Sequence, residues 1–287
     1  MDKNKGAFLL VLPALLISIS IIIIPGIMTL YTSLTDWNGF TSSMKFIGLE
    51  NFKYLFGNRY FWTALKNNIM WTILFLTIPV VIGMGAALLL LEFKRSRNIL
   101  QVIFLTPYML ASIVNTMIWQ NIIYNPIAGL IGWLNRLGFD LQSPLTMKDY
   151  ALYAVAGVDI WHYWGFLAVV YFAALRQTPE DQLEAAKLEG ANFFQQFRYI
   201  YYPNIRPTFM LMSIMIIIFS FLAFDYVYLL TQGGPAHATE LLSTLSYTLA
   251  FKEFKLGRAS ACALFMSMFG LLASAIYTKL SKSEERY

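Results

Sequence analysis

Six long apolar runs, separated by shorter polar segments, set the pattern of this 287-residue chain. A helix needs roughly 20 residues to cross about 30 Å of hydrocarbon, and only helices satisfy their backbone groups across lipid in runs of this length. The pattern therefore predicts an all-α integral membrane protein with six transmembrane helices. The predicted spans are Ala7–Tyr31, Ile69–Leu91, Ile99–Trp119, Ala151–Leu175, Phe209–Leu230 and Ala259–Tyr277.

The first apolar run is predicted to stay in the protein as a membrane span. It is far longer than the roughly 7–15 residues of the apolar core of a signal peptide, and no small-residue cleavage site follows it. Prolines inside the spans, such as Pro79 and Pro107, are expected to kink helices whose neighbours satisfy the freed carbonyls. The sequence has no internal repeat or linker, so one transmembrane domain is expected over residues 1–287.

Composition supports the membrane assignment and narrows the chemistry. Hydrophobic residues make up 58% of the chain and charged residues only 13%, whereas soluble domains carry about 25% charged residues. The basic residues flank the apolar runs and form no single patch, which argues against a nucleic-acid partner and for membrane lipid. The single Cys262 and the two histidines, His162 and His237, show no metal-ligand spacing, so we expect neither a metal site nor an intramembrane enzyme.

The distribution of Lys and Arg predicts the orientation. With both termini on the inner side, 12 of the 21 basic residues fall in the inner segments, which are shorter in total than the outer ones. Positive charge concentrates on the cytoplasmic side of membrane proteins. Both termini and the polar segment 179–207 are therefore predicted to be cytoplasmic.

The segment 179–207 is the only long polar stretch between apolar runs on that side, and its residues predict two short helices. Thr178 is expected to cap the first, with Pro179 at its first position and Gly190 at its end. Asn192 and Gln195 form a capping pair for the second, which Pro203 is expected to stop. Local spacing alone also allows an ordinary solvated loop.

This segment resembles the EAA loop of ABC-importer permease subunits, which have the type I importer fold. The matching residues are Glu184, Ala185, Ala186, Gly190, Ile200 and Pro203, while Tyr202 replaces the usual Leu. The resemblance implies that the loop inserts a short coupling helix into a cleft of a separate ATP-hydrolysing subunit. Glu184 and Gly190 are then expected to set its shape, with Phe193, Phe194 and Phe197 as apolar contacts for that cleft.

Ionisable residues inside spans are costly and are functional candidates by default. Asp159, His162, Tyr163 and Phe166 share one helical face of the fourth span. Aromatic rings stack on sugar rings and short polar groups bind hydroxyls, so this face suits a carbohydrate. The alternative, that Asp159 and His162 are hydrated near the outer boundary of the membrane or pair with each other, stays open. Asp225 in the fifth span is a candidate by the same argument, with helix packing or an outer gate as the alternatives to ligand contact.

The fifth span ends in Phe224-Asp225-Tyr226-Val227-Tyr228-Leu229-Leu230-Thr231, followed by Gly233-Gly234-Pro235. This stretch resembles the signature of carbohydrate-uptake permeases of the type of the larger maltose-importer subunit, whose big periplasmic insertion is missing here. Aligned from Glu184, the sugar-lining positions of that family fall on His162, Tyr163, Phe166, Ile216, Phe219, Ser220 and Ala223. Most of the family's identities at these positions are not kept, which implies a different saccharide.

The resemblance implies a permease subunit of a binding-protein-dependent, ATP-driven importer of sugars, of oligosaccharides in particular. Expected partners are a second permease subunit, two ABC ATPase subunits and an extracytoplasmic solute-binding protein, in a bacterial or archaeal plasma membrane. The chain has no Gly-rich nucleotide loop with Lys-Ser/Thr, so it is expected to be no enzyme and to hold no cofactor, with ATP–Mg bound by the ATPase partner.

Two alternatives remain. One is import of another polyol or of glycerol phosphate, although a phosphate needs a cation and the expected lining offers only His162. The other is an ion-coupled secondary transporter that uses Asp159 and Asp225, against which the missing internal repeat weighs.

Overall fold

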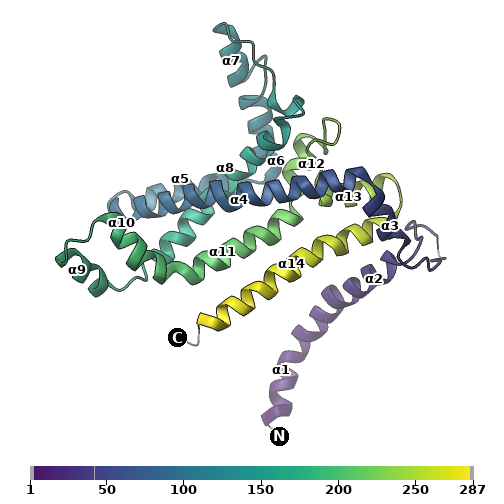
Figure 1. The fold of residues 1–287 in the computed structure, drawn as a ribbon, viewed down its shortest axis with the longest axis horizontal. Coiled ribbons are helices and arrows are strands. Elements are labelled where there is room, and N and C mark those ends of the chain that lie inside the picture. The colour runs from purple at the N-terminus through teal and green to yellow at the C-terminus, as the bar shows by residue number, and fades with distance from the viewer. Residues whose placement is uncertain (1–2, 42, 285–287) are drawn as a thin grey trace. The chain divides into compact units, whose positions relative to one another are not determined.

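Helices make up every regular element that the computed structural model describes, which covers residues 3–41 and 43–284 (Figure 1). Within these residues, 5 helices are long and apolar enough to cross a membrane, and the number rises to 6 when one bent helix pair counts as a single span. The prediction of an all-α membrane protein with six crossings is confirmed. Arg286, one of the basic residues used to predict the orientation, lies outside the described residues.

The chain divides into two compact units, one made of Met1–Trp62 and Leu245–Met268, the other of Thr63–Thr244 and Phe269–Tyr287. The divisions fall inside three helices, namely α4 (Arg59–Glu92), α13 (Leu242–Tyr247) and α14 (Leu256–Glu284). The single transmembrane domain expected for residues 1–287 remains a prediction.

The first unit carries the N-terminal apolar run and the segment that follows it. Asn51 fastens that segment, because its side-chain amide donates to the carbonyl oxygens of Ser33 at 2.8 Å and Thr35 at 2.7 Å. Next to this point the backbone amide of Gly257 donates to the carbonyl of Trp37 at 3.0 Å. The whole helical elements of this unit are α1 (Lys3–Ser18), η1 (Ile19–Ile23), α2 (Ile24–Ser33), α3 (Glu50–Gly57) and η5 (Thr248–Lys252).

The second unit is built around α8, which lies against α5 and α11 and supplies many of the buried side chains. Leu167, Tyr171 and Leu175 of α8 are fully buried, as is Trp71 of α4. The whole elements of this unit are α5 (Arg97–Met109), α6 (Ser112–Ile118), η2 (Trp119–Ile123), α7 (Leu130–Arg136), η3 (Pro144–Thr146), α8 (Ala151–Leu175), α9 (Glu180–Leu188), α10 (Phe193–Gln196), η4 (Phe197–Tyr201), α11 (Tyr202–Leu222) and α12 (Asp225–Leu230).

Glycines let the helices of this unit approach closely. A Cβ built on Gly83 would lie 2.8 Å from the Cβ of Leu167, and a Cβ built on Gly165 would fall on the carbonyl oxygen of Phe104. Membrane helices use small residues in this way, because van der Waals contact replaces the hydrophobic driving force that is missing in lipid. These two contacts hold α4 and α5 against α8, the helix that carries Asp159.

The predicted continuous third span, Ile99–Trp119, is wrong. Helix α5 ends at Met109, Leu110 and Ala111 are extended, and the following helix turns away by 96°. In an unbroken helix the carbonyl of Pro107 would accept the amide of Ala111. Here that carbonyl accepts the backbone amide of Leu110 at 3.3 Å and the buried side-chain amide of Asn115 at 3.2 Å, so it keeps hydrogen-bond partners in an apolar environment.

The fifth span is also broken, near its C-terminal end, although Phe209–Leu230 was predicted as one helix. Helix α11 ends at Leu222 and α12 begins at Asp225, since Ala223 leaves the helical conformation with ψ 124°. The freed carbonyl of Ser220 accepts the side-chain amide of Asn68 at 2.9 Å. The carbonyl of Ala223 accepts the hydroxyl of Ser243. At the second break the freed carbonyls thus bond side chains distant in the sequence, whereas at the first break Asn115 lies near Pro107 in the chain.

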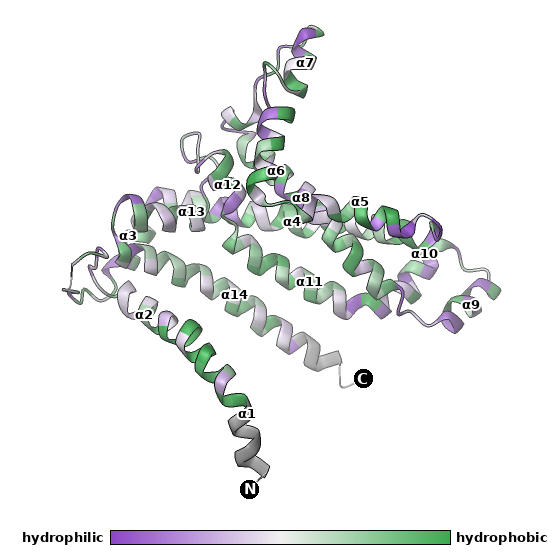
Figure 2. Cartoon of the chain, turned by 180° about the vertical axis from the view of Figure 1, so that it is seen from behind, coloured by the Kyte–Doolittle hydropathy of each residue, from purple (hydrophilic) through white to green (hydrophobic). Residues whose placement is uncertain are grey.

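The two ends of the second unit differ in kind. Figure 1 shows α9 and α10 beyond one end of α11, while α12 follows its other end. Figure 2 shows α9 mostly hydrophilic and α11 mostly hydrophobic. Two candidate sites follow from this division, a cavity beside α12 and a helical hairpin at α9 and α10.

Candidate functional site

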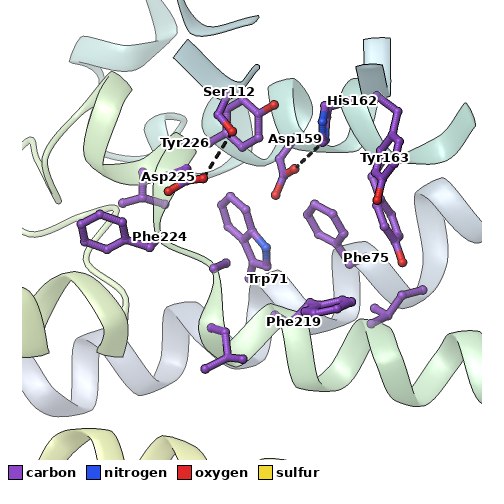
Figure 3. A pocket seen from close by; sticks show the side chains of 16 residues that line it. Trp71, Phe75, Ser112, Asp159, His162, Tyr163, Phe219, Phe224, Asp225 and Tyr226 are labelled. Atoms are coloured by element: carbon purple, nitrogen blue, oxygen red, sulfur yellow. Dashed lines mark hydrogen bonds and ion pairs between the residues drawn. The ribbon is translucent and has the colours of Figure 1, made fainter. Parts of the chain in front are cut away.

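A cavity of about 360 Å³ lies within the second unit, where both broken spans meet α4 and α8 (Figure 3). Its wall comes from six helices and from the Ala223–Phe224 break itself. The residues that line it are Trp71, Phe75, Tyr108, Ser112, Asp159, His162, Tyr163, Ile216, Phe219, Ser220, Leu222, Ala223, Phe224, Asp225, Tyr226 and Val227.

Aromatic rings form much of this wall. The rings of Trp71 and Phe75 stack, with centroids 5.4 Å apart, and Phe75 lies 6.0 Å from Tyr163. Tyr108 continues the cluster, 6.4 Å from Tyr163 and 5.0 Å from the imidazole of His162. Flat apolar faces of this kind give a pyranose ring a surface on which to stack.

Polar groups complete the lining. Asp159 and His162 lie one turn apart on α8, with Oδ1 and Nδ1 separated by 3.6 Å, which is too long for a hydrogen bond. The hydroxyl of Ser112 donates to Asp225 at 3.3 Å. Ser220 is only 2% exposed, and its hydroxyl has no hydrogen-bond partner among the described residues.

The geometry of this wall depends on two buried asparagines. Asn68 donates to the carbonyl of Ser220 and accepts the backbone amide of Leu242 at 2.8 Å. Asn115 bridges the two broken spans, because its side-chain amide donates to the carbonyl of Pro107 and to the hydroxyl of Tyr226 at 3.0 Å. Each asparagine fixes the backbone behind a cavity residue, so the lining is held in place by buried hydrogen bonds.

The structure brings together six of the seven predicted substrate residues. His162, Tyr163, Ile216, Phe219, Ser220 and Ala223 all line the cavity. Phe166, the seventh, is not among the lining residues; its ring stacks on Tyr108 with centroids 4.8 Å apart.

Sequence reasoning missed half of the wall. Trp71 and Phe75 come from the second span and Tyr108 from the third, whereas the residues predicted to contact substrate lie only on the fourth and fifth spans. The spacing of Trp71 and Phe75, four residues apart on one helical face, was a signal that the sequence contained. Ser112 and the position of Asp225 depend on the two helix breaks, which the sequence pattern did not reveal.

The polar segment 179–207 begins with the expected hairpin. Helix α9 ends where predicted, because Gly190 has a φ of +79° and the amide of Ala191 donates back to Ala186 at 2.9 Å. The capping box of the second helix is also confirmed, with the Gln195 amide donating to Asn192 at 2.9 Å and the Asn192 amide donating to Gln195 at 2.8 Å.

Two details of the hairpin were predicted wrongly. Pro179, not Thr178, occupies the N-cap of α9, and the Thr178 hydroxyl makes no cap bond. Pro203 does not stop the second helix, since the chain runs from α10 through the π-helical turn η4 into α11. The helix continues because Pro203 lies in the first turn of α11, where a missing amide costs little, and the Asn204 side chain donates to the carbonyl of Ile200 at 2.8 Å.

The predicted coupling residues lie on this hairpin. Glu184 is exposed and Ala185 and Ala186 lie beside it on α9; Ile200 is half-buried. Phe194 is 74% exposed and Leu188 is 90% exposed. Phe193 is also exposed, whereas Phe197 is half-buried, with its ring 6.4 Å from that of Tyr202. Large apolar side chains on a polar hairpin are typical of a protein interface.

A family of known proteins matches most of the chain. Residues 79–286 fit the family described as the binding-protein-dependent transport system inner membrane component. The chain belongs to this family, and it is therefore an inner membrane permease subunit of an ABC transport system.

Characterised and inferred relatives align over nearly the full length. A probable ABC transporter permease of Pyrococcus horikoshii is 30% identical over 97% of this chain and 96% of its own. A probable permease for starch degradation products of Thermoanaerobacterium thermosulfurigenes is 30% identical, covering 97% and 94%. The trehalose/maltose transport system permease of Thermococcus litoralis is 29% identical, covering 98% and 95%.

A solved structure shares the fold. This chain superimposes on a chain of a bacterial ABC transporter involved in the import of the acidic polysaccharide alginate, with a TM-score of 0.85, 22% identity, and coverage of 98% and 96%. The likeness confirms the predicted ABC-importer permease fold.

Proposed function

We propose that this chain is one of two permease subunits of an ATP-driven sugar importer, and that oligosaccharides are its substrates. The cavity carries the proposal: aromatic faces and short polar groups line one cavity inside a member of the permease family. Such a lining offers stacking and hydrogen bonding to a saccharide. The relatives whose names specify trehalose, maltose or starch degradation products support the same substrate class.

In this proposal the hairpin couples the cavity to a separate ATPase. The exposed side chains Leu188, Phe193 and Phe194 enter a cleft of the ATPase subunit, and the EAA residues Glu184 and Gly190 hold the hairpin in shape. Helix α11 continues from η4 to the cavity wall at Ile216 and Phe219, so a displacement of the hairpin moves that wall as a rigid element. ATP–Mg binds to the ATPase subunits, and this chain contributes no catalytic group.

The remaining assignments belong to the same proposal. The second permease subunit completes the translocation path, and an extracytoplasmic solute-binding protein delivers the sugar to the outer side. The hairpin and both termini lie on the cytoplasmic side of a bacterial or archaeal plasma membrane.

The proposal is tested with the complete transporter in vesicles, using a panel of labelled neutral saccharides. Uptake is expected to require ATP on the hairpin side and to persist when a protonophore collapses the ion gradients. Uptake that a protonophore abolishes and that ATP depletion leaves unchanged would instead establish the ion-coupled mechanism.

A further inference from the structure

We propose that Asp159 and Asp225 determine substrate specificity by charge, so that the cavity accepts uncharged saccharides and rejects those that carry a carboxylate. The inference rests on the proposed sugar-import function and adds the class of sugar and the residues that select it. Both side chains line the one cavity, Asp159 from α8 and Asp225 from the first turn of α12 (Figure 3).

The ionisable side chains of the cavity wall are mainly acidic. Its lining residues include two carboxylates and no Lys or Arg, and His162 is the one side chain among them that can carry a positive charge. That imidazole already faces Asp159 across 3.6 Å. An anionic ligand would therefore have to share the His162 imidazole with Asp159.

A second observation indicates that the cavity binds a ligand with hydroxyl groups. Ser220 lines the cavity, is almost completely buried, and leaves its hydroxyl without a hydrogen-bond partner among the described residues. A buried hydroxyl without a partner is unfavourable unless a ligand or water supplies one. A saccharide hydroxyl can both donate to and accept from Ser220.

The carboxylates complement such a ligand. An ionised carboxylate only accepts hydrogen bonds and can take two donors at once, which matches a pair of adjacent sugar hydroxyls. A uronate unit presents an acceptor-only anion to the same oxygens. The anion would lose its hydration without gaining a donor, and it would meet like charge, which costs affinity.

The fold does not impose this preference. The solved transporter that shares the fold takes part in the import of an acidic polysaccharide. The charge of the substrate is therefore left to the side chains and partners of each transporter, and in this chain the acidic side chains of the cavity wall are Asp159 and Asp225.

The test compares two ligands that differ in one group. The first is the neutral saccharide that the wild-type transporter takes up best in the panel, and the second is the same saccharide with one primary alcohol oxidised to a carboxylate. Affinities of both for the purified complex without its binding protein are measured by saturation-transfer NMR. Leaving out the binding protein removes its own selectivity from the measurement.

The wild-type complex is expected to favour the neutral form. Asp159→Asn and Asp225→Asn, which keep the shape of each side chain, should each reduce that preference about tenfold, because one like charge is removed. Asp181→Asn is the matched control, since Asp181 is an exposed carboxylate on α9. It should leave the preference unchanged, and thermal unfolding verifies that all three variants are folded.

Two results would overturn the inference while leaving sugar import intact: equal affinity of the wild type for both forms, or an unchanged preference in both cavity variants. Failure of the proposed function looks different, since no saccharide of either charge would then be taken up.

Discussion

Two glycines show how differently the two candidate sites are built. Gly165 in α8 touches the backbone of α5 so closely that even a methyl group would collide with Phe104, whereas Gly190 in the hairpin has open space around it and is needed only for its positive φ. The cavity is held by long-range packing and buried hydrogen bonds. The hairpin is held by local backbone bonds and leaves its apolar side chains exposed. A rigid binding site and an adaptable docking element therefore occur in one unit.

The largest expected effect is from Gly165→Ala. The added methyl group meets a backbone carbonyl that cannot rotate away, so α5 and α8 must separate. We expect a loss of about 3 kcal/mol or more of stability, measured as a fall in the unfolding temperature in detergent and in the fraction inserted. The matched control, Gly190→Ala, has room for its methyl group and carries only the strain of the positive φ, about 1–2 kcal/mol, so its unfolding temperature should fall much less. Equal unfolding temperatures for both variants would contradict the contrast.

Asn68→Ala comes next. It leaves the carbonyl of Ser220 and the amide of Leu242 buried without partners. Each unsatisfied group costs about 1–3 kcal/mol, so a loss of about 2–6 kcal/mol is expected together with weaker sugar binding. Denaturation and ligand titration of the purified complex measure the two effects.

Asn135→Ala is the control for this change. Asn135 likewise bonds backbone groups, two carbonyl oxygens and the amide of Leu141, but these bonds are exposed, so water replaces them. Asn135→Ala should therefore lower the free energy of unfolding by less than about 1 kcal/mol. A cost as large as that of Asn68→Ala would show that burial is not what makes the cavity bonds important.

Gly190→Val should act on coupling more than on stability. A β-branched residue is strained at a φ of +79°, by roughly 1–2 kcal/mol, and the strain shifts Ala191 and the second helix. ATP hydrolysis by the transporter is then expected to continue with little uptake. Gly190→Asn, which tolerates this conformation, should restore much of the uptake. If the Gly190→Val transporter takes up a normal amount of sugar per ATP hydrolysed, the hairpin does not couple ATP hydrolysis to transport.

The smallest effect is predicted for Asn192→Ala, which removes the capping box. A lost cap costs about 1 kcal/mol, and because the hairpin is local the unfolding temperature should hardly change. Faster hydrogen exchange at Gln195 and its neighbours would report the fraying. Asn192→Ser keeps a cap acceptor and should exchange like the wild type; identical exchange in the Ala variant would mean that the cap is dispensable.

The contrast between a hairpin held by local bonds and a cavity held by distant contacts also explains which features the sequence could predict. The positions of Gly190, Asn192 and Gln195 define the hairpin through bonds between residues close in the chain, and local rules found both helices there. The continuation through Pro203 was missed because the π-helical turn and the Asn204 side chain compensate for that proline. Six spans followed from apolar length alone.

The cavity was only partly predictable, because its shape depends on contacts between distant residues. Helical spacing placed His162 and Tyr163 on one face, and those two do line it. The breaks after Met109 and Leu222 depend on Asn115 and Asn68, two polar residues in apolar runs that bond Tyr226 and Ser220 far along the chain. Asp225 enters the cavity through one of these breaks, and spacing within the fifth span could not show that.

The most direct test of the account is the position of a bound saccharide in the complete transporter, determined by cryo-electron microscopy with the neutral sugar that it takes up. The account predicts sugar density in the cavity, stacked on the aromatic wall near Tyr163 and Phe219 and within hydrogen-bond distance of Ser220 and an aspartate. Density elsewhere along the transport path, with this cavity empty under conditions that support uptake, would contradict it.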